Sequence, residues 1–102
     1  MVVIKEPVEF DWNKWNIGKN KKHGVDEKEA EEIFQDERKV TFKDRVHSDF
    51  EERFRVIGKT KCKRLLFVVF TIRKEKVRII SARDINKKEV FLYEKKVNTS
   101  KV

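Results

Sequence analysis

Residues 65–84 constrain the fold of this chain more than any other segment. Residues 65–70 are an unbroken run of Leu, Val and Phe, which is too short to cross a membrane and typical of a strand buried on both faces. Residues 73–76 are polar, and residues 77–82 are apolar again except for Arg78 and Ser81. Two apolar runs separated by a short polar gap predict a β-hairpin. The gap lacks an Asn-Gly or Asp-Gly pair, so the sequence leaves the turn type open.

The segments before this hairpin predict further strands. In residues 50–57 apolar and charged side chains alternate, and Gly58 follows as the predicted end of the strand. This strand and the hairpin together form a three-stranded antiparallel meander. Residues 2–10 contain Pro7 and predict an N-terminal strand at a sheet edge, or an extended arm. Residues 40–42 are a candidate for another short strand.

The clearest helix begins after Asp26. Asp26 and Glu29 have the spacing of a capping box, which pairs side chains with free backbone N–H groups at a helix start. Ala30, Ile33 and Phe34 then fall on one face of the helix. The acidic residues around them suit a solvated face near the positive end of the helix dipole, so we do not interpret them as catalytic carboxylates.

Two other segments are candidate helices. Asn86 and Glu89 repeat the N-cap spacing, and apolar residues follow at positions 90, 93 and 97. Residues 90–93 taken alone would also suit a strand. A short helix between residues 13 and 23 would end at Gly24.

These elements define the expected architecture. A chain of 102 residues supports one modest core, and its 8 Phe and 2 Trp supply apolar bulk although 43% of its residues are charged. We therefore expect a single domain over residues 1–102, with its core in residues 8–97. The predicted fold class is α+β: an antiparallel sheet, made of the meander and an N-terminal strand, flanked by two or three short helices.

Charge is distributed unevenly along the chain. The formal net charge is +8: residues 1–25 carry five bases and three acids (+2), residues 26–52 five bases and eleven acids (−6), and residues 53–102 sixteen bases and four acids (+12). A basic half of this size attracts a polyanion, nucleic acid first, or an acidic protein partner. Charge alone does not separate these two partners.

Arg73, Arg78 and Arg83 are spaced along the predicted hairpin. Arginines held on a rigid sheet beside solvent suit phosphate binding, although solvated charges at strand ends explain the same spacing equally well. His23 lies beside Lys22 and before Gly24, at a predicted helix end. It is either a helix-end residue without a chemical role or a general acid/base placed next to cations.

Several kinds of protein are disfavoured by what the sequence lacks. Cys62 is the only cysteine, which rules out an internal disulfide and a cysteine-based metal site. No segment has the pattern of a signal peptide or a membrane helix. We find no glycine-rich phosphate loop, no metal-ligand spacing and no nucleophile triad. We therefore expect a cytoplasmic protein that uses no metal and no cofactor.

The order and spacing of several short motifs resemble the BrnT toxin family across residues 10–93. In the N-terminal half the resemblance lies in FDWN (10–13), KHGV (22–25) and EAEEIF (29–34). In the C-terminal half it lies in ER (52–53), GKT (58–60), LLFVVFTIR (65–73), RIISAR (78–83), KE (88–89) and Tyr93.

This resemblance implies a RelE-like fold and a metal-independent endoribonuclease toxin of a bacterial type II toxin–antitoxin system, which cleaves RNA and inhibits translation. It implies neutralisation by a BrnA-like antitoxin with a DNA-binding domain, and contact with operator DNA only through that complex, which represses its own operon. The catalytic residues would be His23 for proton transfer and Arg73 and Arg83 for charge stabilisation. The residues that bind RNA would be Lys22, Arg53, Arg78, Lys88 and Tyr93. The alternative is a non-enzymatic basic module that binds RNA or protein.

Overall fold

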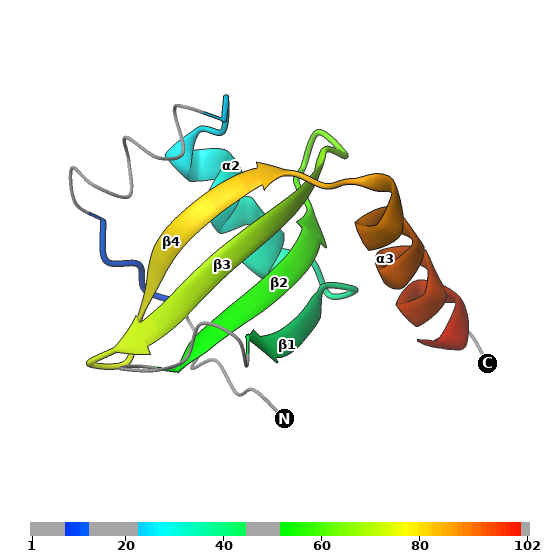
Figure 1. Ribbon diagram of the computed structural model, residues 1–102. Coiled ribbons are helices and arrows are strands. Elements are labelled where there is room, and N and C mark those ends of the chain that lie inside the picture. Colours follow the sequence, from blue (N-terminus) through cyan, green and yellow to red (C-terminus); the bar gives the residue numbers. More distant parts are fainter. Residues whose placement is uncertain (1–7, 13–22, 45–51, 101–102) are drawn as a thin grey trace.

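The computed structural model describes residues 8–12, 23–44 and 52–100 (Figure 1). Within these residues the fold is α+β, with four strands in one antiparallel sheet in the order β1-β2-β3-β4. The elements in chain order are α2 (Glu27–Glu32), the 3-10 helix η1 (Ile33–Gln35), β1 (Val40–Asp44), β2 (Arg53–Lys59), β3 (Leu65–Arg73), β4 (Lys76–Asp84) and α3 (Lys87–Ser100).

The predicted hairpin is confirmed as β3 and β4, which pair antiparallel over their whole length. Lys74 and Glu75 connect them with positive φ angles of 50° and 68°. Two consecutive positive φ angles are the pattern of a type I′ turn, whose twist matches the twist of the paired strands. Neither residue is Gly or Asn, which is why the turn type could not be predicted from the sequence.

The predicted end of β2 at Gly58 was wrong, because the strand continues to Lys59. Gly58 lies within the ladder, paired with Leu66, and its missing side chain leaves room for η1. A Cβ atom at this position would lie 2.8 Å from Ile33 Cβ and 2.9 Å from the Ile33 carbonyl oxygen. This glycine therefore permits close packing of a helix on the sheet rather than a turn.

The fourth strand of the sheet is β1, and not the N-terminal segment. β1 pairs antiparallel with β2 from Val40 opposite Ile57 to Asp44 opposite Arg53. Of the predicted N-terminal strand, residues 8–10 are described, and they add one isolated parallel bridge at Phe10 to the edge of β4. The rest of that prediction, and most of the predicted helix at residues 13–23, lie outside the described residues.

Both predicted capping boxes are present at the starts of the two described α-helices. The backbone N–H of Asp26 donates to Glu29 Oε1 (3.2 Å), and α2 begins at the next residue. The backbone N–H of Asn86 donates to Glu89 Oε1 (2.9 Å), and the N–H of Glu89 donates to Asn86 Oδ1 (2.9 Å). α3 follows, so residues 90–93 are helical and the alternative of a strand there was wrong.

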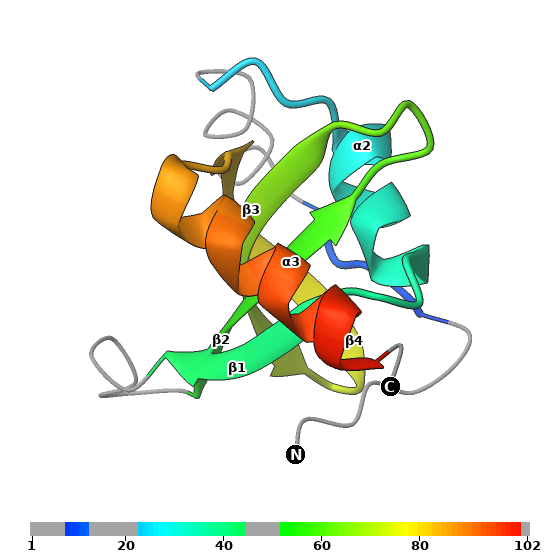
Figure 2. The same cartoon turned by 90° about the vertical axis from the view of Figure 1, so that its right-hand side faces the viewer.

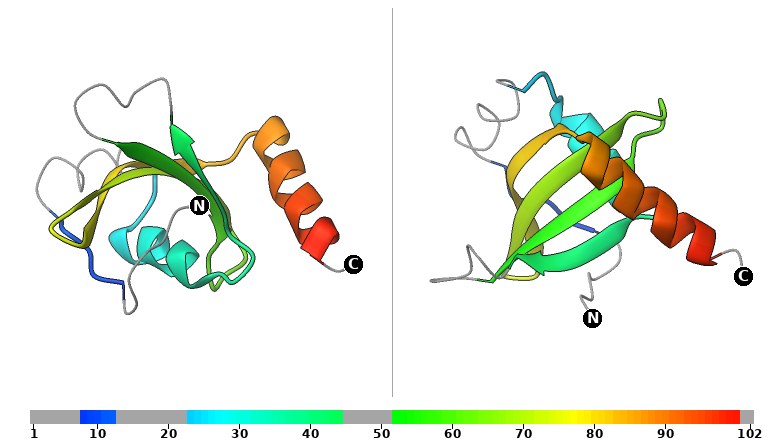
Figure 3. Two further views of the ribbon diagram at one scale, coloured as in Figure 1. Left: turned by 90° about the horizontal axis from the view of Figure 1, so that it is seen from below. Right: turned by 45° about the vertical axis from the view of Figure 1, so that its right-hand side comes forward.

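The two faces of the sheet are covered by different helices. α2 and η1 pack on one face, and the sheet curves around them (Figure 3). This main core joins Ile33 and Phe34 to residues of β2, β3 and β4, and the rings of Phe34 and Phe70 lie 5.2 Å apart. α3 lies on the opposite face (Figure 2), where Tyr93 packs with Ile57 and Phe67 in a second cluster.

Candidate nucleic-acid interface

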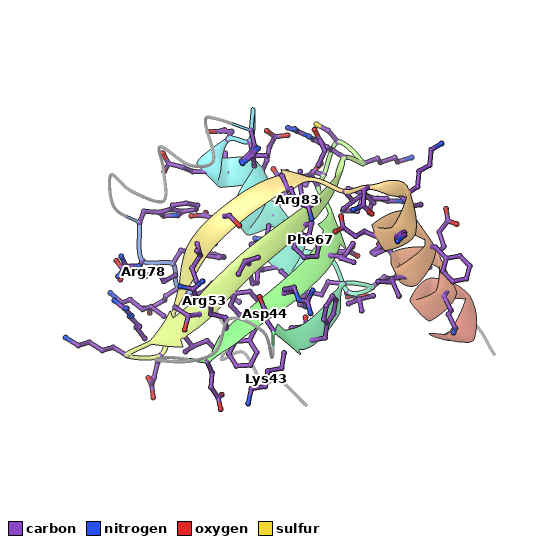
Figure 4. The ribbon with its side chains drawn as sticks, in the orientation of Figure 1. Lys43, Asp44, Arg53, Phe67, Arg78 and Arg83 are labelled. Carbon is purple, nitrogen blue, oxygen red and sulfur yellow. The ribbon has the colours of Figure 1, made fainter. Side chains whose placement is uncertain are left out.

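The face of the sheet opposite α2 carries a set of arginines at fixed register positions. It is called here the open face, although Tyr93 of α3 packs on Ile57 and Phe67 at one end of it. On β2, β3 and β4 one row across the sheet is Arg53, Thr71 and Arg78. The next row is Arg55, Val69 and Ser81, and the row after it is Ile57, Phe67 and Arg83. Because side chains alternate along a strand, these three rows all project from the same face. Figure 4 shows Arg53, Arg78, Arg83 and Phe67 on this side of the sheet.

A β-bulge brings Arg78 and Arg83 to the same face. The two residues are five positions apart, so in a regular strand they would point to opposite faces. The register shifts between Val69 and Phe70, which pair with Ser81 and Ile79, so that Ile80 is an extra residue on β4. The inserted residue reverses the alternation and re-aims the arginines, as bulges commonly do near functional sites.

Arg83 is held on the open face by a carboxylate, a backbone carbonyl and an aromatic ring. Its Nη1 and Nη2 donate to the two carboxylate oxygens of Glu89 at 2.9 and 2.7 Å, and Nη1 also donates to the Asp84 carbonyl oxygen at 3.1 Å. Its guanidinium carbon lies 4.3 Å from the centre of the Phe67 ring. The side chain remains 38% exposed, so the guanidinium is oriented from one side and accessible from the other.

The cations around Glu89 lower its pKa. Burial alone would raise the pKa of Glu89, but the hydrogen bonds from Arg83 and from the Asn86 backbone, with the nearby charges of Arg83 and Arg55, outweigh burial and lower it. The same pair raises the pKa of Arg83 against the opposing effect of burial. Since Glu89 belongs to α3 and Arg83 to β4, this ion pair also joins the helix to the sheet.

Arg55 was not among the predicted site residues, and the structure adds it. Its guanidinium carbon lies 4.7 Å from the centre of the Phe42 ring, and its charge contributes to the lowered pKa of Glu89. Its Nε is buried and has no hydrogen-bond partner among the described residues. Alternation in residues 50–57 did place Arg53 and Arg55 on one face, but only the strand pairing shows that Arg83 projects from the same face.

His23 is exposed in the turn before α2, and Arg64 connects this turn to the end of β4. Arg64 Nη1 donates to the Gly24 carbonyl oxygen (3.0 Å), while its Nε and Nη2 donate to the two carboxylate oxygens of Asp84 at 2.7 and 3.0 Å. Hydrogen bonding to Arg64 holds the pKa of Asp84 below its ordinary value, although burial acts in the opposite direction. Because Asp84 follows Arg83, His23 and Arg83 lie at the same end of the sheet, with His23 in the turn before α2 and Arg83 on the open face.

The structure does not bring Arg73 to that end. Arg73 pairs with Lys76 at the β3–β4 turn, whereas Arg83 pairs with Phe67, six residues away along β3. Six residues of a strand span about 20 Å, so Arg73 and Arg83 cannot contact the same phosphate group.

The remaining predicted RNA-binding residues are Lys22, Lys88 and Tyr93. Lys88 is exposed on α3, and Lys22 lies outside the described residues. Tyr93 is buried at 5% exposure, and its hydroxyl donates to Asp36 Oδ2 at 2.7 Å. Burial and this carboxylate both raise the pKa of Tyr93. The tyrosine therefore holds α3 against the segment after η1.

The described residues contain no group of three or more His, Cys, Asp or Glu side chains arranged to hold a metal ion. None of their helices is long and apolar enough to span a membrane.

The fold and the open face define a small α+β protein with arginines fixed on one side of an antiparallel sheet. Residues 12–89 match the family described as ribonuclease toxin, BrnT, of type II toxin-antitoxin system. This match covers most of the chain, and the protein belongs to that family. A comparison with curated proteins found no match.

Proposed function

We propose that this protein is the toxin of a bacterial type II toxin–antitoxin system, and that it is an endoribonuclease with a RelE-like fold that needs no metal ion. Its activity would inhibit translation and growth. The observation that carries the proposal is Arg83, which Glu89 and Phe67 orient on an otherwise open basic face in a chain of a ribonuclease toxin family.

The proposed reaction is attack of a ribose 2′-oxygen on the adjacent phosphorus atom. The 2′-hydroxyl gives up its proton, the bond from phosphorus to the 5′-oxygen breaks, and that oxygen receives a proton. The products are a 2′,3′-cyclic phosphate and a 5′-hydroxyl. Negative charge that develops on the phosphate oxygens needs preorganised donors, and a fixed guanidinium is such a donor. We assign this role to Arg83.

His23 is the proposed group for proton transfer. Imidazole is the side chain that most often serves as a general acid or base. Arg64 ties the turn that contains His23 to Asp84, the residue that follows Arg83 on β4. Arg73, being about 20 Å away from Arg83 along the strand, is assigned to RNA binding together with Arg53, Arg78, Lys22 and Lys88.

The proposed partner is a BrnA-like antitoxin with a DNA-binding domain. It would neutralise the toxin, and the complex would repress its own operon. Growth assays test this part: expression of the toxin alone is expected to arrest growth, and co-expression of an antitoxin encoded beside it is expected to restore growth. Unimpaired growth on expression of the soluble toxin alone would contradict the proposal.

Incubation of purified protein with end-labelled RNA in EDTA tests the activity. We expect cleavage products that carry a 2′,3′-cyclic phosphate. Intact RNA, both with and without added ribosomes, would favour the alternative of a non-enzymatic RNA- or protein-binding module.

A further inference from the structure

Basic side chains on the open face follow one another at regular intervals along β3. Beginning at Phe67 and moving two residues at a time, the rows contain Arg83, then Arg55, then Arg53 with Arg78, and finally Arg73 with Lys76. Residues two apart on a strand are separated by about 6.7 Å, so the four rows extend over about 20 Å. These residues come from three strands, so no linear motif reveals the series.

Successive rows have a spacing close to that of neighbouring phosphates in an extended single strand of RNA. We propose that these six residues, the phosphate track, bind about four consecutive phosphates of an extended single-stranded RNA that lies along β3. This inference rests on the proposed function, and it adds the substrate conformation, the length of the binding site, and Arg55 and Lys76 as RNA-binding residues.

The side chains of the track suit phosphate groups. A guanidinium presents a planar set of donors that matches two phosphate oxygens at once. Arg55 retains a buried Nε without a hydrogen-bond partner among the described residues, and a buried donor of this kind is normally satisfied by a ligand or water. The row next to Arg55 contains Arg53 on β2 and the half-buried Arg78 on β4, with Thr71 of β3 between them. The two arginines therefore stand on either side of Thr71, where a single strand fits between them.

A duplex fits this surface less well. The phosphates of an A-form helix wind around its axis, so a series of cations that runs in one direction along β3 contacts only the few that face the sheet. An extended single strand can instead place each successive phosphate on the next row. The track therefore favours single strands over duplexes of the same length.

Fluorescence anisotropy with labelled 2′-O-methyl oligonucleotides tests the track separately from cleavage, because these RNAs lack the 2′-hydroxyl nucleophile. We expect affinity to rise with length up to about five nucleotides, which contain four linking phosphates, and then to level off. The plot of log affinity against log salt concentration is expected to have a slope of about −3, since each neutralised phosphate of a single strand contributes about −0.7.

Arg55→Ala and Arg78→Ala are each expected to weaken binding roughly tenfold and to reduce the salt slope by about 0.7. Lys28→Ala is the charge-matched control, because Lys28 is exposed on α2 on the other side of the sheet. Equal affinity for a duplex of the same length, or unchanged binding in both arginine variants, would overturn the track. If the wild type binds as described but leaves unmodified RNA intact, the track stands and the proposed ribonuclease activity fails.

Discussion

Arg83 and Glu89 form a two-bond ion pair, with donor–acceptor distances of 2.9 and 2.7 Å, that links β4 to the first turn of α3. The same carboxylate accepts a hydrogen bond from the Asn86 backbone and thereby caps the helix. One side chain therefore starts the helix, docks it on the sheet and orients the cation to which we assign charge stabilisation. These three roles can be separated experimentally.

Glu89→Gln keeps the shape of the side chain but removes its charge. We expect the free energy of unfolding to fall by about 1 kcal/mol, because the ion pair is partly exposed to solvent. RNA should bind more tightly, since a negative charge leaves the open face, while single-turnover cleavage should slow because Arg83 loses its orienting partner. Urea denaturation, anisotropy and single-turnover kinetics measure these three effects. A variant that binds and cleaves RNA like the wild type would contradict a positioning role for Glu89.

Stability is expected to decline in acid. The folded protein holds the pKa of Glu89 below its ordinary value of 4.5 and that of Asp84 below its ordinary value of 3.8. A carboxylate with a lowered pKa stabilises the fold fully above its unfolded pKa, and this contribution is lost as the pH falls through the folded pKa. The free energy of unfolding should therefore decrease below about pH 4.5, and less steeply in Glu89→Gln. Equal slopes in the two proteins would show that Glu89 contributes nothing to the acid response.

Tyr93→Phe tests whether Tyr93 supports the fold or binds RNA. Its hydroxyl donates to Asp36 Oδ2, and the Lys59 backbone N–H donates to the same oxygen at 2.9 Å. Loss of the hydroxyl should lower the free energy of unfolding by about 1–2 kcal/mol, because a hydrogen bond to a carboxylate disappears. RNA affinity at a temperature well below the unfolding transition should not change. A drop in affinity without a loss of stability would instead support the RNA-binding role that the sequence suggested.

The two described glycines of the fold should respond differently to alanine. Gly58→Ala places a Cβ atom 2.8 Å from Ile33 Cβ, so either η1 or β2 must shift, and we expect a loss of about 2–3 kcal/mol. In Gly24→Ala the added Cβ atom has no neighbour within 4 Å, but Gly24 has a φ of +69°. Backbone strain should therefore lower the free energy of unfolding by about 1 kcal/mol. Chemical denaturation of both variants gives the comparison. A larger loss in Gly24→Ala would contradict the packing argument.

Local patterns predicted most of the strands and both described helices. The hairpin, the alternation before it and the two capping boxes depend on neighbours within a few residues, and each is readable in the sequence. The end of β2 was misjudged because Gly58 is required by Ile33, which contacts it only in the folded protein. The sequence could not show that β1 completes the sheet instead of the N-terminal segment, because strand pairing is a tertiary property.

The candidate site was predicted only in part, for the same physical reason. Arg78 and Arg83 share a face because of the bulge at Ile80, and no residue type in β4 predicts that bulge. Arg73 and Arg83 are both hairpin arginines in the sequence, yet the antiparallel pairing places them at opposite ends of the sheet. Arg55 gains its importance from Phe42 and Glu89, which come from other elements.

The central claim is that Arg83 stabilises the charge that develops during RNA cleavage. The most direct measurement is single-turnover cleavage of a labelled RNA in EDTA by the wild type, Arg83→Ala and Arg83→Lys, with Lys28→Ala as the control on the other side of the sheet. We predict that wild type and control cleave at the same rate, that Arg83→Ala is slowed about 100-fold or more, and that Arg83→Lys regains only part of the rate because a lysine cannot reproduce the planar donors. Wild-type cleavage by a folded Arg83→Ala protein would contradict the account.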